Sequence, residues 1–324
     1  MEKGEGNVMT KFDYNAFTKS FKKIAKAINQ DNYTYSNEVL YAACDGINVL
    51  PLPLSDKVAE SMQNGQDPDG ATKEQLDRFT SMLLLIGRAY AASPERRRGA
   101  KTINDGMDTF FRRLAKEIVM QRERYGKWYC LVKKLSAQSY TLDKSSDDTD
   151  MLRHSIWCVC ELNSMIRIAI EGIDHLTNLS LATNCVSFCS KFLHFTAPNA
   201  FFIMDRLSCE GAKALFKGKV AEVTRLSYKG DLIELHEAER KEFKNTHGVF
   251  QKDLPDYIAS EGTSKVKTAH KEYFEHCFRV YSVACLIKEI TPISQTNKFH
   301  GNTKLCSMPR LVDSIVMRIK IKKE

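Results

Sequence analysis

Apolar residues recur at steps of three and four through most of the chain, the spacing of one face of an α-helix. The segment FTKSFKKIAKAI shows it first, because Phe17, Phe21 and Ile24 fall on one face. The same period predicts helices over 17–28, 72–92, 101–137, 151–171, 178–195, 206–216 and 267–290. Only YKGDLIEL, at 228–235, has the pattern of a short hairpin. The predicted fold class is therefore mainly α.

The most polar stretch is LDKSSDDTD, at residues 142–150. Polar stretches between periodic segments are typical of loops, so we expect an exposed linker there and a boundary between two lobes. The predicted organisation is an N-terminal helical lobe with basic helices over 1–145, a second helical lobe over 146–290 and a C-terminal segment over 291–324. A length of 324 residues is compatible with such a division.

Composition narrows the class of protein. Hydrophobic residues make up 43% and charged residues 27%, a balance that excludes wholesale disorder. The densest apolar stretch, 82–86, is far shorter than the roughly 18 residues of a membrane-spanning helix. The first residues carry no apolar segment of a secretion signal, so we expect a cytoplasmic protein whose ten cysteines stay reduced. No two cysteines have C-x2-C spacing, and we expect no metal site.

Basic residues exceed acidic ones, 48 against 40, which gives a formal net charge of +8. Residues 93–134 hold twelve Lys or Arg and five Asp or Glu, so this stretch nearly accounts for the surplus. The predicted contacts to DNA backbone phosphates are Arg96, Arg97, Arg98, Lys101, Lys213, Lys217 and Lys219. A helix start flanked by arginines suits a phosphate. A merely solvated charged face is the alternative interpretation.

The most informative run is CVSFCSKFLHFTAPNAFFIMDRLSCEGAKAL, at residues 185–215. Its first part, 186–195, is too apolar for a surface helix, yet Lys191 lies inside it. A buried lysine must reach solvent along its stem or stay inside at a cost in free energy. The sequence TAPN then predicts a turn and FFIM an extended piece. Asp205 follows directly before the next helical pattern, where an N-cap residue belongs.

This arrangement resembles the helix–hairpin–helix DNA glycosylases, and among them the 8-oxoguanine glycosylase/lyases. In those enzymes a lysine lies at the start of the hairpin's second helix, and an apolar run delivers an aspartate to the N-terminus of a following helix. Here Lys191 stands at the place of the lysine and Asp205 at that of the aspartate. The segment differs from the family in having no glycine in CVSFCSK and no proline directly before Asp205.

The resemblance implies a two-lobed helical fold and excision of a damaged or modified base from DNA, in repair or in defence against phage. It implies no metal and no organic cofactor. Breaking an N-glycosidic bond builds positive charge on the sugar, which a carboxylate such as that of Asp205 stabilises. A neutral Lys191 amine can attack the sugar carbon and form a Schiff base, which permits strand cleavage. Burial can lower a lysine pKa far enough for this.

The partner implied is DNA with one nucleotide flipped out of the duplex, and the flipped base needs a pocket with aromatic walls. Candidates for this pocket are Arg88, Tyr90, Phe188 and His194. We interpret Arg88 as a buried arginine whose partner is a carboxylate or a base edge.

Less specific interpretations stay open for the same residues. Asp205 is also explained as a plain N-cap and His194 as a core histidine. Lys191 is also explained as a lysine that reaches solvent or as the partner of an unidentified carboxylate. The alternative functions are a non-catalytic helical protein that binds nucleic acid and a helical interaction protein in which this segment is only core.

Overall fold

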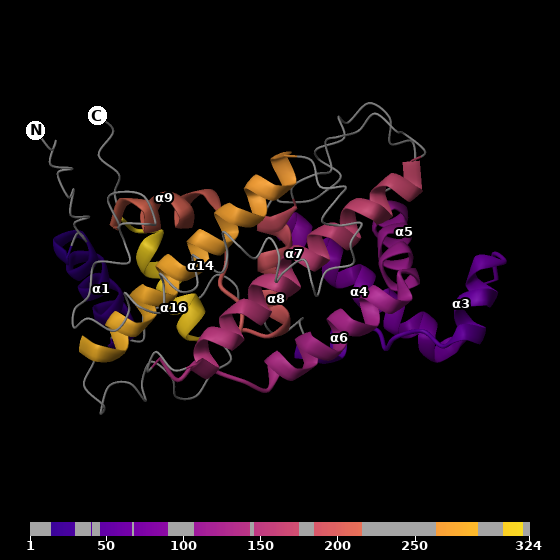
Figure 1. Cartoon of the computed structure of the whole chain (residues 1–324), viewed down its shortest axis with the longest axis horizontal. Helices are drawn as coiled ribbons and strands as arrows, with labels where there is room; N and C mark the ends of the chain where they lie inside the picture. Colours follow the sequence, from indigo (N-terminus) through magenta and orange to yellow (C-terminus); the bar gives the residue numbers. More distant parts are fainter. Residues whose placement is uncertain are drawn as a thin grey trace, which may run out of the picture.

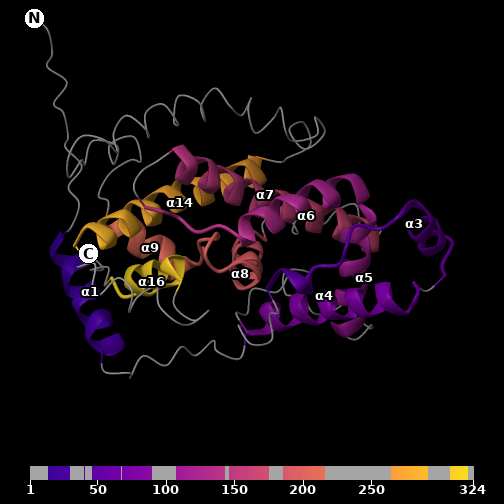
Figure 2. The same ribbon diagram turned by 90° about the horizontal axis from the view of Figure 1, so that it is seen from below.

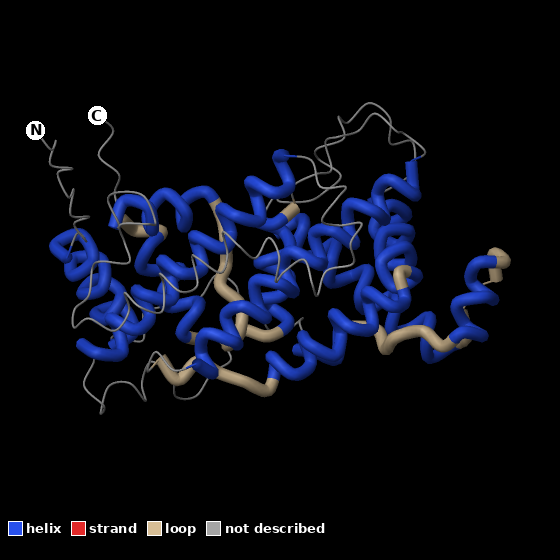
Figure 3. Tube along the Cα trace, viewed as in Figure 1, coloured by secondary structure: helices blue, strands red, loops and turns tan. Residues whose placement is uncertain are grey.

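The computed structural model describes residues 14–29, 40, 46–66, 68–89, 107–142, 146–174, 185–215, 264–290 and 307–319. Within these ranges the chain forms helices joined by turns and extended loops, and no strand is present (Figure 3). The mainly α prediction is therefore confirmed. The predicted hairpin at 228–235 lies outside the described residues.

The helices follow the sequence periodicity closely. They are α1 (Tyr14–Asn29), the 3-10 helix η1 (Gly46–Val49), α3 (Asp56–Gln63), α4 (Gly70–Ala89), α5 (Met107–Met120), α6 (Arg122–Ser136), α7 (Ser146–Asp174), α8 (Val186–Thr196), α9 (Arg206–Leu215), α14 (Ser264–Ile290) and α16 (Met308–Val316). The single pattern at 101–137 is two helices, α5 and α6, which meet at Gln121. Helices α3 and α16 were not predicted from the sequence.

The helices form an elongated body with two groups at its ends (Figures 1 and 2). One group consists of α1, α9, α14 and α16, and the other of α3, α4, α5 and α6. Between them, α7 packs on α5, α6, α8 and α14, and α8 packs on α4, α7 and α14. Helix α1 contacts α9 and α16, so helices from the first and last predicted segments lie together. The lobe boundaries at 145 and 290 stay a prediction.

The prediction of a linker or exposed loop over 142–150 is wrong from Ser146 onward, where the chain is helical. Helix α7 begins at Ser146, and Asp148 is 2% exposed. The carboxylate of Asp148 accepts hydrogen bonds from the backbone N–H groups of Thr141 and Leu142, at 2.7 and 2.6 Å. It also accepts one from the Tyr281 hydroxyl on α14, at 2.8 Å. The buried carboxylate thus fixes the chain between α6 and α7 to a third helix.

Helices α9 and α16 approach so closely that only glycine fits at one position. A Cβ atom built on Gly211 of α9 lies 1.9 Å from the carbonyl oxygen of Val316 on α16. The backbone of α16 would therefore have to move to accommodate any side chain there. This contact sets the distance between α16 and the helix that Asp205 precedes.

We expect Gly211→Ala to destabilise the protein by about 3 kcal/mol, because overpacking against rigid backbone forces helices apart. Denaturant unfolding measures the loss. Gly126→Ala in α6 is the matched control, since the nearest atom to its added Cβ is Pro53 Cβ at 3.9 Å. That variant should gain up to about 1 kcal/mol from helix propensity. Equal stability of the two variants would contradict the close approach.

Candidate active site

Helix α8 carries the lysine in the interior of the protein. Every residue from Phe188 to Thr196 is buried, and Lys191 is 4% exposed. Phe192 of this helix packs edge-on against Phe79 of α4, with ring centroids 5.7 Å apart. The apolar run that predicted a buried helix therefore does place α8 between α4 and α7. The family resemblance implied a lysine at a helix start, but Lys191 lies in the middle turn of α8.

An extended segment, Phe201–Asp205, joins α8 to α9 and is held through its backbone. The carbonyl groups of three successive residues accept hydrogen bonds from buried side chains: Phe201 from His194 Nδ1 at 2.8 Å, Phe202 from the Tyr273 hydroxyl at 3.0 Å and Ile203 from His276 Nε2 at 2.8 Å. The N–H of Met204 donates to Ser190 Oγ at 3.0 Å. Side chains of α8 and α14 thus fix the residues directly before Asp205.

Asp205 is the N-cap of α9, as the sequence predicted. Its Oδ1 accepts the backbone N–H of Ser208 at 2.8 Å, and its carbonyl oxygen accepts the N–H of Cys209 at 2.9 Å. The side chain is 21% exposed, so the second carboxylate oxygen lies toward the surface or toward Lys191.

The fold brings the two predicted catalytic side chains together. Lys191 Nζ lies 4.0 Å from Asp205 Oδ2 and donates a hydrogen bond to Ser187 Oγ at 3.1 Å. Burial lowers the pKa of Lys191 below its ordinary value, and the negative charge of Asp205 opposes this shift. The geometry is that of a buried amine beside a partly exposed carboxylate.

The role of the four predicted base-pocket residues stays a prediction. Phe188 and His194 are buried in the core. Burial lowers the pKa of His194 to about 3, so its imidazole is neutral near neutral pH. Its Nδ1–H donates a hydrogen bond to the Phe201 carbonyl oxygen. Arg88 is exposed at the end of α4 and is not a buried arginine. Tyr90 lies outside the described residues.

Of the predicted backbone-phosphate contacts, Lys213 is exposed on α9. The remaining residues of that set lie outside the described part of the chain: Arg96, Arg97, Arg98, Lys101, Lys217 and Lys219. For these residues the phosphate contact stays a prediction.

Sequence reasoning missed a third ionisable group near the lysine. Asp313 of α16 is 2% exposed, and its Oδ2 pairs with Arg310 at 2.5 Å. Burial raises the pKa of Asp313 to about 6, although the guanidinium of Arg310 lowers it. The available signal was the pattern MPRLVDSIV, where an aspartate and an arginine interrupt apolar residues at helical spacing.

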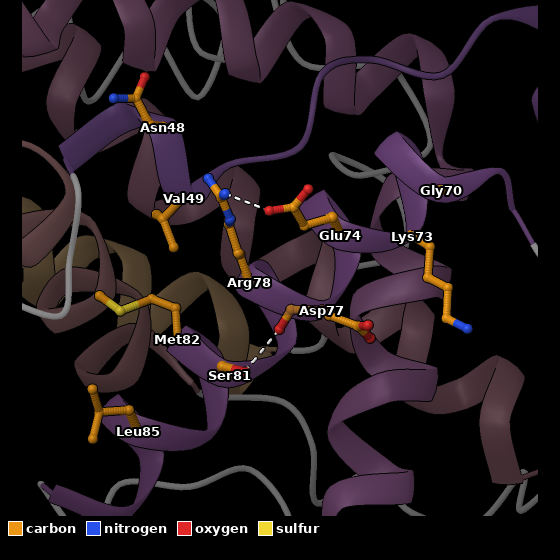
Figure 4. Close-up of a pocket in the computed structure, with 10 residues that line it drawn as sticks. All are labelled: Asn48, Val49, Gly70, Lys73, Glu74, Asp77, Arg78, Ser81, Met82 and Leu85. Atoms are coloured by element: carbon orange, nitrogen blue, oxygen red, sulfur yellow. Dashed lines mark hydrogen bonds and ion pairs between the residues drawn. The ribbon is translucent and has the colours of Figure 1, made fainter.

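A groove of about 550 Å³ opens elsewhere, along α4 and η1 (Figure 4). Its lining residues are Asn48, Val49, Gly70, Lys73, Glu74, Asp77, Arg78, Ser81, Met82 and Leu85. Arg78 pairs with Glu74, and Asp77 pairs with Arg112 at 3.6 Å. These ion pairs neutralise much of the charge that lines the groove. Neither Lys191 nor Asp205 lines this groove.

Three further features bear on the class of site. In the described ranges, no three His, Cys, Asp or Glu side chains cluster in a way that could hold a metal ion. Eight cysteines of those ranges are free thiols. None of the described helices is both long enough and apolar enough to span a membrane.

Comparison with family models, with curated proteins and with solved structures gives no match in any of the three.

A lysine kept for chemistry should be dispensable for stability. We expect Lys191→Met to leave the free energy of unfolding unchanged or to raise it by about 1 kcal/mol, because methionine fills the space without a charge to desolvate. Thermal and denaturant unfolding measure it. Arg124→Met is the control, since Arg124 pairs with Glu161 at 2.6 Å and both are buried. That variant should lose about 3–5 kcal/mol. A similar loss in Lys191→Met would make the lysine structural.

Proposed function

We propose that this protein is a DNA N-glycosylase that removes a damaged or modified base, with Asp205 and Lys191 as its catalytic residues. The observation that carries the proposal is the 4.0 Å distance between Lys191 Nζ and Asp205 Oδ2. Two groups fourteen positions apart converge, one inside a buried helix and one at the head of the next. The likeness of residues 185–215 to the helix–hairpin–helix glycosylases supports the same chemistry.

Asp205 has the position and charge to stabilise the transition state. As the bond from the sugar C1′ to the base nitrogen breaks, the base leaves with the electron pair and positive charge builds on C1′ and the ring oxygen. A fixed carboxylate beside this charge lowers the barrier more than a mobile one, because it needs no reorganisation. The hydrogen bond from Ser208 N–H at 2.8 Å fixes Asp205 in this way.

Lys191 is the candidate nucleophile for a lyase step. Its neutral amine forms an N–C bond at C1′ as the base departs, and opening of the sugar ring then gives a Schiff base. The amine must first lose its proton, and burial favours this by disfavouring the ammonium. If water attacks C1′ instead, the enzyme is monofunctional and Lys191 only positions charge.

A nucleotide would approach from the side of Asp205, which is the more exposed of the two. The next two residues, Arg206 and Leu207, are both exposed, Leu207 at 49%. An arginine suits a phosphate, and an exposed leucine suits the face of an unstacked base or sugar. These side chains lie directly beside the catalytic carboxylate in the sequence.

A basic surface next to α9 suits the DNA backbone. Helix α1 contains no acidic residue, and Lys19, Lys22 and Lys23 are exposed along it. Its opposite face is buried through Phe17 and through Ser20, whose hydroxyl donates to the Ile315 carbonyl oxygen at 2.8 Å. Helix α1 packs against α9, on which Lys213 is also exposed.

Borohydride trapping tests the proposal directly. Purified protein is incubated with duplexes that carry an abasic site or oxidised, alkylated, deaminated or glucosylated bases. We expect a covalent adduct that is absent in Lys191→Gln and kept in Lys57→Gln, an exposed lysine of α3. Asp205→Asn should slow base release by about 100-fold or more, the effect of losing one electrostatic stabiliser.

Two other outcomes have clear meanings. Base release that survives Lys191→Gln and is lost in Asp205→Asn identifies a monofunctional glycosylase. Release that neither variant changes contradicts the assignment of both residues. Tight DNA binding with no release from any duplex favours the non-catalytic nucleic-acid-binding protein.

The basic surface predicts a salt dependence. The triple variant Lys19→Gln, Lys22→Gln, Lys23→Gln should weaken binding to all duplexes alike. It should also reduce the slope of log K against log salt by up to about 0.9 for each lost phosphate contact. Fluorescence anisotropy at several salt concentrations measures both. The matched control changes Lys57, Lys73 and Lys127, three exposed lysines of α3, α4 and α6, to Gln. Equal slopes in the two triple variants would move the DNA path away from α1.

A further inference from the structure

A histidine of α14 lies at the centre of the contacts that hold Asp205. Nε2 of His276 lies 2.8 Å from the carbonyl oxygen of Ile203, two residues before Asp205. The same nitrogen lies 3.3 Å from the hydroxyl oxygen of Ser208, three residues after Asp205. The backbone N–H of Ser208 in turn donates to Asp205 Oδ1 at 2.8 Å. One imidazole nitrogen therefore contacts the chain on both sides of the candidate catalytic carboxylate.

The partners of His276 determine which of its ring nitrogens carries the proton. A carbonyl oxygen can only accept a hydrogen bond, so the contact with Ile203 requires the proton on Nε2. Nδ1 is buried and has no hydrogen-bond partner among the residues that the structure describes. Burial lowers the pKa of His276 to about 4, so the imidazole is neutral near neutral pH. His276 is thus a neutral donor with a single N–H, directed at the segment before α9.

The contacts of His276 are shielded from water and belong to a larger set on α14. His276 is 1% exposed and Ser208 is fully buried, so water does not compete for the bonds between them. One turn earlier on α14, the Tyr273 hydroxyl donates to the Phe202 carbonyl oxygen at 3.0 Å. Side chains from successive turns of one helix therefore bind two successive carbonyl groups before Asp205.

The same segment is tied to the helix that carries the lysine. The N–H of Met204, the residue directly before Asp205, donates to Ser190 Oγ at 3.0 Å. Ser190 precedes Lys191 on α8, and α14 packs against both α8 and α9. The backbone before Asp205 is thus held by α8 through Ser190 and by α14 through His276.

We propose that His276 is a positioning residue for Asp205, and that its Nε2–H group fixes the place of this carboxylate relative to Lys191. His276 acts through the backbone of Ile203 and through Ser208, without touching the substrate. The proposal deepens the proposed function, on which its catalytic meaning rests. A carboxylate that is fixed beside a developing charge stabilises it more than one that must reorganise. The distance that His276 keeps constant is the 4.0 Å between Lys191 Nζ and Asp205 Oδ2.

Two amide variants separate the Nε2–H group from the rest of the side chain. The glutamine of His276→Gln is long enough to place an N–H donor where Nε2 lies. The shorter asparagine of His276→Asn places its donor near Nδ1, which has no partner among the described residues. Both variants remove the ring and bury a neutral amide, so a loss caused by packing or polarity should be similar in the two. A loss of positioning should appear in His276→Asn and be much smaller in His276→Gln.

Amide hydrogen exchange in the full chain, followed by NMR, tests the positioning without a substrate. We expect His276→Asn to raise the exchange rate of the Ser208 N–H, which binds Asp205, by on the order of tenfold, the effect of about one net hydrogen bond. In His276→Gln the rate should stay within about twofold of the unchanged protein. Tyr281→Phe is the control, because it removes another buried hydrogen bond of α14, the 2.8 Å bond to Asp148. It should leave the exchange of Ser208 unchanged.

Single-turnover base release links the positioning to catalysis. The substrates are the duplexes that carry oxidised, alkylated, deaminated or glucosylated bases. We expect His276→Asn to lower the rate constant of release by roughly 10- to 100-fold, because a small misplacement of a catalytic group is enough for such a loss. The dissociation constant for DNA should stay unchanged, and His276→Gln should recover most of the rate. A variant that is only less stable loses amplitude, since fewer molecules are folded, and keeps its rate constant.

A measurement on the unchanged protein keeps the test decisive if His276→Asn does not fold. ¹⁵N NMR distinguishes the protonated from the bare nitrogen of a neutral imidazole, and the His276 signals are those missing from His276→Gln. The proposal requires the proton on Nε2. A proton on Nδ1 would overturn it, because the contact with Ile203 would then join two acceptors.

The remaining outcomes also decide. Equal exchange of Ser208 in His276→Gln and His276→Asn would overturn the proposal, and so would an equal rise in Tyr281→Phe. If the unchanged protein releases no base from any duplex, the proposed function fails, while the exchange rates still decide whether His276 positions Asp205. If base is released and His276→Asn changes the exchange but not the rate constant, the histidine has no part in the chemistry.

Discussion

The structure depends on keeping an amine in an apolar interior. Lys191 lies between aromatic residues of α8 and is 4% exposed, where an isolated ammonium would be expensive to hold. Its amine donates a hydrogen bond to Ser187 Oγ at 3.1 Å, and a carboxylate oxygen of Asp205 lies 4.0 Å away. Burial lowers the pKa of this amine, and the negative charge of Asp205 opposes the shift.

The geometry of this amine depends on a short piece of extended chain. Residues Phe201–Asp205 follow a turn and form neither helix nor strand. Their backbone groups still find partners, because His194, Tyr273 and His276 donate to three successive carbonyls. Burial lowers the pKa of His194 to about 3 and of His276 to about 4, so both imidazoles stay neutral donors near neutral pH. These polar core residues form hydrogen bonds with the backbone that positions Asp205.

Local pattern was enough to predict most of this framework. Consecutive residues determine the buried helix with its lysine, the turn, the extended piece and the N-cap at Asp205. Hydrophobic periodicity and capping chemistry therefore predict them. The convergence of Lys191 and Asp205 was an expectation from resemblance, and the two side chains lie 4.0 Å apart.

The features that the sequence did not predict depend on contacts between distant parts of the chain, and a local sequence pattern does not indicate such contacts. The position of His194, three residues after Lys191, favoured a pocket residue or a core histidine, and only the structure shows that its partner is the Phe201 carbonyl. The polar segment before α7 looked like a linker, yet Asp148 is bound by Tyr281, 133 positions away. Asp313 was missed because the helix that carries it, α16, was not predicted. Arg88 was misread because a short apolar run does not tell which face of α4 is covered.

The hydrogen bond between Ser20 and the Ile315 carbonyl joins residues 295 positions apart. During synthesis, Lys191 and Asp205 leave the ribosome long before α16 exists to cover α9 and complete their surroundings. Until α16 is made, α9 therefore lacks the helix whose backbone packs against Gly211. The last of the described helices thus completes the packing around the segment that carries Asp205.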